Sequence, residues 1–224
     1  MDPLSITAAT IAIIGSISST YNAIQHLRGL PKAFLGVGQN LPLVKETLEL
    51  ARSQLQGPSD ESVKKAIEPV IHDCQEKAIA LNKIFDELEK AMKQEKDAND
   101  WSALVNFYRK TVVYMGKSHK VETLMQELLN NLKWLAIHQL FKVTGQGLTV
   151  KLENAINELS VVEPSLPDSD FDMKGTNITQ TNSDNARGFV STGRHQENTM
   201  GHKFHSAGNM SFGLKTDFQE STDV

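Results

Sequence analysis

The sequence predicts an all-α fold, namely an antiparallel helical bundle followed by a disordered tail that is potentially amyloid-forming through cross-β stacking. Up to about Pro164, apolar residues recur at spacings of three and four, which is typical of amphipathic helices joined by short loops. After Pro164 the chain is rich in Gly, Asn, Ser and Thr and contains no Trp or Tyr, so it cannot bury a core of its own. We therefore expect a helical bundle over residues 1–162, a flexible linker over 163–181 and an assembly motif over 182–218.

The first helix is expected over residues 3–27. Asp2 supplies an N-cap acceptor, Pro3 fits the first helical position, and Gly29 and Pro31 end the helix. The face expected to be buried carries apolar residues at helical spacing: Ile6, Ala9, Ile13, Ile17, Ile24 and Leu27.

The next two helices each contain a proline. The second helix is expected to begin near Pro42 and to end before the turn at Gly57. The third, over residues 63–92, has the strongest apolar periodicity of the chain, and Pro69 is expected to kink or restart it.

Three shorter helices complete the predicted bundle. Asn99 and Asp100 are expected to cap the fourth helix, the fifth follows Gly116, and a short last helix ends before Pro164.

Composition narrows the class of partner. The chain holds 23 Lys and Arg against 27 Asp and Glu, for a net charge of −4, so it lacks the strongly basic surface that drives nucleic-acid binding. The single cysteine, Cys74, lies in the apolar stripe of the third helix. It therefore predicts a buried structural thiol in a reducing, intracellular compartment.

Motifs for catalysis or cofactor binding are missing from the sequence. There is no Gly-rich phosphate loop followed by Lys, no His-Glu-x-x-His and no paired cysteines. His195, His202 and His205 gather in the tail without the further ligands that a metal site needs. We therefore expect no cofactor, no metal site and no enzymatic activity.

The N-terminal segment has two interpretations. Its 25 residues from 3 to 27 contain no Asp, Glu, Lys or Arg, and a segment of this length can span a bilayer, yet seven of them are Ser or Thr. One interpretation is a central buried helix of the bundle. The other is a helix that docks on the bundle at rest and enters lipid when triggered. The residues expected to contact lipid in that case are Ile6, Ile11, Ile13, Ile14, Gly15 and Ile17.

The tail repeats a short phrase. Phe189-Val-Ser-Thr-Gly193 is followed 15 residues later by Phe204-His-Ser-Ala-Gly208. Phe favours strands, Gly permits corners, and Asn can form amide ladders between stacked chains. The residues expected to form the amyloid motif are Phe189, Gly193, Gly201, Phe204, Gly208, Asn209, Phe212 and Gly213. The alternative is a disordered tail in which the repeat is accidental.

The opening residues Met1-Asp2-Pro3-Leu4-Ser5-Ile6-Thr7-Ala8 resemble the start of fungal N-terminal domains found on NACHT and other STAND receptors, including the HeLo-like and SesA-like groups. A bundle followed by an assembly-prone tail is similar to the HET-s type of architecture. That resemblance implies a membrane-disrupting bundle over about residues 1–160. It also implies a tail that a receptor with a matching motif templates into amyloid.

The function expected on this basis is that of a fungal regulated-cell-death effector. Its partners would be an activated NACHT/STAND receptor, further copies of itself through the tail, and membrane lipids, but no nucleic acid. It would be cytoplasmic and would relocate to the plasma membrane on activation. The alternative is a soluble helical adaptor in STAND-type signalling with a passive tail.

Overall fold

The computed structural model describes residues 2–57, 61–94, 99–137 and 145–171. Over these residues the fold is all-α, as predicted, with six α-helices, three short 3-10 turns and no strand. The elements in chain order are α1 (Pro3–Ile24), α2 (Lys32–Gln56), α3 (Glu61–Gln94), η1 (Trp101–Ala103), α4 (Val105–Met115), η2 (Lys117–His119), α5 (Val121–Ile137), α6 (Gly145–Ser160) and η3 (Asp168–Asp170).

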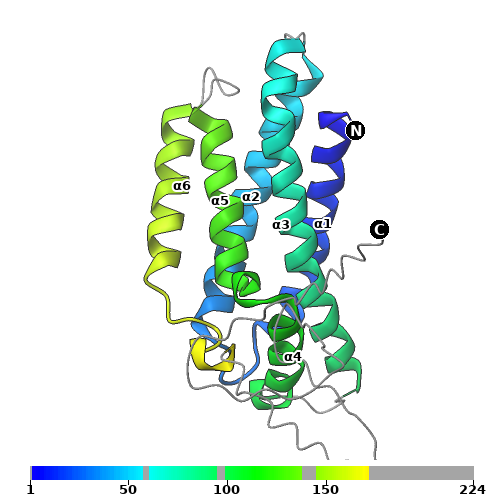
Figure 1. Cartoon of the computed structure of the whole chain (residues 1–224), viewed down its shortest axis with the longest axis vertical. Helices are drawn as coiled ribbons and strands as arrows, with labels where there is room; N and C mark the ends of the chain where they lie inside the picture. Colours follow the sequence, from blue (N-terminus) through cyan, green and yellow to red (C-terminus); the bar gives the residue numbers. More distant parts are fainter. Residues whose placement is uncertain (1, 58–60, 95–98, 138–144, 172–224) are drawn as a thin grey trace, which may run out of the picture. The chain divides into compact units, whose positions relative to one another are not determined.

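The five longer helices lie side by side (Figure 1). α1 packs on α2 and α3, while α5 packs on α2, α3 and α6. The shorter α4 packs against α3 at one end of the bundle. The core is a continuous set of buried apolar side chains contributed by every α-helix. α1 is therefore an integral layer of the bundle in this state.

The start of α1 is as predicted. The backbone N–H of Ser5 donates to the Asp2 carboxylate at 3.2 Å, and Pro3 occupies the first turn. The helix ends at Ile24, and the chain turns at Gly29, whose φ of +78° favours glycine. The loop is then fixed by two backbone hydrogen bonds that join Arg28 to Asn99 and Trp101.

The predicted start of the second helix is wrong, because α2 begins at Lys32, directly after Pro31, and continues through Pro42. A proline within a helix removes one N–H donor and usually kinks or breaks the helix. Here the apolar stripe runs across the proline without a change of period, and its burial on both sides holds one helix together. The stripe comprises Phe34, Val37, Leu41, Val44 and Leu48.

In α3 the structure shows one helix through Pro69, with no restart. Ile67 and Ile71 are both buried on either side of this proline, so packing again carries the helix across it.

Four aromatic rings join the ends of α2 and α3 to η1 and α4. Phe34 lies at the centre, with its ring centroid 4.8 Å from Trp101, 5.0 Å from Tyr108 and 5.9 Å from Phe85. Such tilted and edge-on pairs stabilise beyond their buried area. This cluster fixes the position of α4, which also contacts the segment that follows α6.

Residues 163–171, which we call the strap, differ from the flexible linker expected there. After α6 the strap crosses to α4 and α5, and Leu166 within it is only 1% exposed (Figure 1, yellow). The Ser165 N–H donates to Glu122 of α5 at 3.0 Å, and the Ser165 hydroxyl pairs with that of Tyr108. The rest of the expected linker, residues 172–181, lies outside the described part of the chain.

Candidate functional site

The candidate site is α1, because it holds the charge-free segment that the sequence singles out. Its buried face consists of Pro3, Ile6, Thr7, Thr10, Ile14, Ile17, Thr20 and Ile24. Ile14, rather than Ile13, lies at the middle of this face, and Ala9 is exposed. Of the predicted lipid-contacting residues, Ile6, Ile14 and Ile17 are buried in the bundle, Ile11 and Ile13 are half-buried, and Gly15 is exposed.

Two of the three buried threonines of α1, Thr7 and Thr10, have their hydroxyls satisfied within the helix. Thr7 donates to the Pro3 carbonyl at 2.7 Å, and Thr10 donates to the Ile6 carbonyl at 2.8 Å. Ser18 makes the same contact to Ile14 at 2.9 Å. A buried hydroxyl is costly only when it lacks a partner. These partners move with the helix, so α1 keeps them in the bundle and in any other apolar surrounding.

The outer face of α1 is small and polar. Ala9, Ala12, Gly15, Ser16 and Ser19 are all exposed. A Cβ at Gly15 would meet nothing within 4 Å, so this position has open space beside it. The face holds no charge, and nothing on it opposes transfer into lipid as an ionised group would.

The Tyr21 ring of α1 lies over Gly38 of α2. A Cβ built on Gly38 would lie 1.9 Å from Cζ of the Tyr21 ring, so only glycine leaves room for the ring in this position. Partial burial raises the pKa of the Tyr21 phenol. The sequence offered no sign of this contact, because the two residues lie on different helices and neither belongs to a motif.

By length and composition, α1 is the one helix among the described residues that could cross a membrane. Its 22 residues correspond to about 33 Å at 1.5 Å per residue, close to the thickness of a hydrocarbon core. Only 33% of its most hydrophobic stretch of 18 residues is buried in the bundle. A core helix of a soluble protein passes the same test.

The amyloid motif predicted in the tail, from Phe189 to Gly213, lies outside the described residues. The same holds for the tail histidines, His195, His202 and His205.

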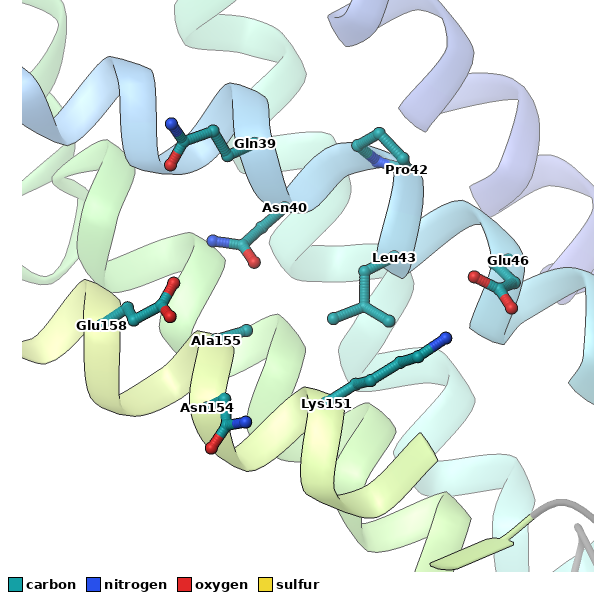
Figure 2. A pocket seen from close by; sticks show the side chains of 9 residues that line it. All are labelled: Gln39, Asn40, Pro42, Leu43, Glu46, Lys151, Asn154, Ala155 and Glu158. Carbon is teal, nitrogen blue, oxygen red and sulfur yellow. The ribbon is translucent and has the colours of Figure 1, made fainter. Parts of the chain in front are cut away.

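One open pocket of about 400 Å³ lies between α2 and α6, next to Pro42 (Figure 2). Its lining mixes two carboxylates, Glu46 and Glu158, with Lys151 and amide side chains. The amide of Asn40 already donates to the Gly36 carbonyl at 2.8 Å. The lining therefore offers scattered, solvent-exposed polar groups without the buried, convergent set that a small-molecule site uses.

Two further groups of side chains have the chemistry for ligation or reactivity. His72, Asp73 and Glu76 lie close together on α3, but all three are exposed, and His72 pairs with Glu76 at 3.6 Å. Cys74 is buried as predicted, and burial together with the charge of Asp73 raises the pKa of its thiol to about 12. This thiol is therefore protonated and shielded at neutral pH, as a structural cysteine should be.

Most of the bundle matches the model of a known protein family. The SesA family model, described as an N-terminal domain on NACHT_NTPase and P-loop NTPases, matches residues 7–135. The matched stretch runs from the first turns of α1 to near the end of α5. No curated protein and no solved structure shows a significant match.

Proposed function

Because the chain belongs to the SesA family of N-terminal domains found on NACHT and P-loop NTPases, we propose that it is a regulated-cell-death effector switched on by such a receptor. The family association fits a signalling or cell-death role and a NACHT partner in general. The proposal adds a mechanism, namely that the tail assembles and α1 then attacks a membrane. It involves no catalytic step.

In the resting protein, α1 is docked on α2 and α3 and the protein is cytoplasmic. An activated receptor presents a cross-β template, and the tail adds to it through backbone hydrogen bonds, as in β-strand addition. Self-association through the tail raises the local concentration of bundles. α1 then leaves the bundle at the plasma membrane and enters lipid.

The observation that supports this proposal most is the internal satisfaction of the buried Thr7 and Thr10 hydroxyls. A helix that must be stable in two apolar surroundings cannot depend on polar partners in only one of them. α1 carries its partners with it and holds no charge over its length. Both properties are what a released helix requires.

The energetics favour release at a membrane over release into water. Four isoleucines of α1 are fully buried: Ile6, Ile14, Ile17 and Ile24. Exposing them to water would cost about 6–12 kcal/mol at about 1.5–3 kcal/mol each, comparable to the whole stability of a domain. Transfer into lipid avoids most of this cost, so release is expected only where a bilayer receives the helix.

The proposal is tested with the full-length protein and dye-loaded vesicles. Fibres grown from a peptide of residues 180–224 are identified by thioflavin T and by the spacing of about 4.7 Å expected of cross-β, and are then added as seeds. Leakage that depends on seeds supports the proposal. A peptide that never assembles removes the trigger, and seeded protein that releases no dye removes the membrane step.

A soluble adaptor is the second candidate function. It is favoured by the burial of four isoleucines of α1 in the core and by the family match itself, which runs from the first turns of α1 to near the end of α5. In that case the intact bundle would recruit partners, the tail would be passive, and no membrane binding would occur under any condition.

A further inference from the structure

Charge is unevenly distributed over two segments that meet in space. Residues 101–121, which cover η1, α4 and η2, contain four cations and no carboxylate: Arg109, Lys110, Lys117 and Lys120. Residues 152–171, which end in the strap, contain five carboxylates and no Lys or Arg. The near-neutral total of the chain conceals this separation.

The strap lies on the cationic segment through three ion pairs. Asp168 accepts from Lys117 at 2.5 Å and from Lys120 at 2.8 Å, and Asp170 accepts from Arg109 at 2.8 Å. These lysines hold the pKa of Asp168 down to about 2. Two carboxylates thus pair with three cations, Arg109 of α4, Lys117 of η2 and Lys120 directly after η2. We call this cationic surface the basic face.

The strap also fills an apolar seat beside those cations. Leu166 is almost completely buried, and the centroid of the Phe171 ring lies 5.2 Å from the Lys120 ammonium. The Lys120 side chain is 6% exposed with the strap in place. If the strap leaves, it uncovers cations and apolar surface together.

The neighbouring surface of α4 has the same mixed character. Lys110, Val113 and Tyr114 follow one another at helical spacing on one side of α4. Tyr114 is 85% exposed, and Lys83 of α3 lies 5.7 Å from its ring centroid. Exposed aromatic rings set among lysines are typical of surfaces that lie at the headgroup level of a bilayer.

We propose that the basic face of α4 and η2 is a binding surface for anionic phospholipid, and that the strap is an acidic competitor that covers it at rest. The apolar seat beside the cations favours a lipid surface over a free anion such as phosphate. The inference rests on the proposed membrane function, because it names the surface that would hold the bundle against lipid while α1 enters.

The strap also connects this surface to the tail. The chain passes directly from Phe171 into residues 172–224, which contain the predicted motif. Any force on the tail during assembly therefore acts first on the strap. Tail assembly and exposure of the basic face would then be two consequences of one event.

The test compares four full-length proteins in co-sedimentation with phosphatidylcholine vesicles, with and without phosphatidylserine. The first is the unmodified chain, and the second carries Asp168→Asn and Asp170→Asn to loosen the strap. The third, Glu49→Gln with Glu76→Gln, makes the same charge change at exposed positions on α2 and α3. The fourth adds Arg109→Gln and Lys117→Gln to the loosened strap. Hydrogen exchange at the Ser165 amide reports docking, because its N–H is bonded to Glu122.

We expect faster exchange at Ser165 and stronger binding to anionic vesicles in the loosened protein than in its charge-matched control. Each cation near an anionic surface contributes about a fivefold gain in binding, so loss of Arg109 and Lys117 should weaken it about 25-fold. Equal binding by the loosened protein and its control would overturn the proposal. So would unchanged exchange at Ser165, or binding that ignores Arg109 and Lys117. The loosened protein is also tested for binding to an RNA oligonucleotide. If it binds the RNA as strongly as the anionic vesicles, the basic face binds polyanions in general, which would contradict a lipid site.

This test is separable from that of the proposed function. Binding is scored by sedimentation and helix entry by dye release. A protein that binds through the basic face without releasing dye would leave this inference standing and reject the attack by α1. Seeded dye release that does not change when Arg109 and Lys117 are replaced would reject the basic face as a lipid site and leave the attack by α1 standing.

Discussion

Gly15→Asp separates the two states of α1, because it leaves the docked helix intact and opposes the inserted one. Gly15 lies on the exposed face of α1, near the middle of the helix, and a Cβ added at this position would have no atom within 4 Å. An aspartate there points to water in the bundle. In a bilayer it would lie near the centre of the hydrocarbon.

The two effects differ in size. Exposed substitutions of this kind change folding stability by about 0.5 kcal/mol or less, and Asp is no worse than Gly within a helix. An aspartate at the centre of a membrane helix costs about 2.5–3.5 kcal/mol. At about 1.4 kcal/mol per tenfold, insertion should fall on the order of a hundredfold while the bundle is unaffected.

The assay is seeded dye release from vesicles, run beside urea unfolding and thioflavin T assembly. Asn22→Asp is the matched control, because it adds the same charge to an exposed residue near the end of α1, where a charge can remain at the interface. We expect Gly15→Asp to assemble and unfold like the unmodified chain but to release little dye, and Asn22→Asp to release dye almost normally.

The reasoning fails if Gly15→Asp releases dye as well as the unmodified chain, since α1 would then not cross the hydrocarbon. It also fails if the two aspartates reduce release equally, because net charge would then explain the effect.

Three further predictions follow from the packing and the charges. Gly38→Ala should destabilise the bundle through its clash with the Tyr21 ring, whereas in a Tyr21→Ala background it should stabilise by about 1 kcal/mol through helix propensity. Urea unfolding of the four proteins measures this, and a Gly38→Ala effect of the same sign in both backgrounds would contradict the close approach of the ring. Cys74 should react with a maleimide at neutral pH only when urea unfolds the protein, because burial raises its pKa to about 12; rapid labelling of the folded protein, seen by mass spectrometry, would refute its burial. The Asp168 carboxyl should titrate near pH 2 by NMR, and its contribution to strap docking, present above the ordinary pKa of 3.8, should be lost as the pH falls through about 2. Lys117→Gln should raise the pKa of Asp168, and a carboxyl that titrates at 3.8 in both proteins would mean that the ion pairs do not form.

Much of the fold could be predicted from local signals. The Asp2 cap and the apolar stripe of α3 both follow from rules that involve residues three or four apart. The start of α2 was mispredicted at Pro42, because a proline is a local signal for a helix start and the burial that overrides it is tertiary. The burial of Thr7 and Thr10 is also tertiary, and their polarity gives no sign of it, because the hydroxyls bond within the helix.

The strap could not be predicted, because its composition is that of a linker. Asp168 and Asp170 lie about 50 and 60 residues from the cations that hold them, and no periodicity connects the two. One signal was available: the segment around α4 holds only cations and the segment that ends in the strap holds only carboxylates. Counting charges over the whole domain averages that signal to nearly zero.

The central claim, that α1 leaves the bundle for lipid, is tested most directly by a single fluorophore on its exposed face. Ala12→Cys places an accessible thiol there, while the buried Cys74 stays unlabelled. An environment-sensitive dye at this position should report water in the resting protein, even when vesicles are present. When the full-length protein is clustered through an inducible dimerisation module at its C-terminus, the account predicts a blue shift and quenching by a quencher within the acyl chains. A dye that still reports water after clustering on anionic vesicles would contradict the account and leave α1 as a permanent core helix of an adaptor.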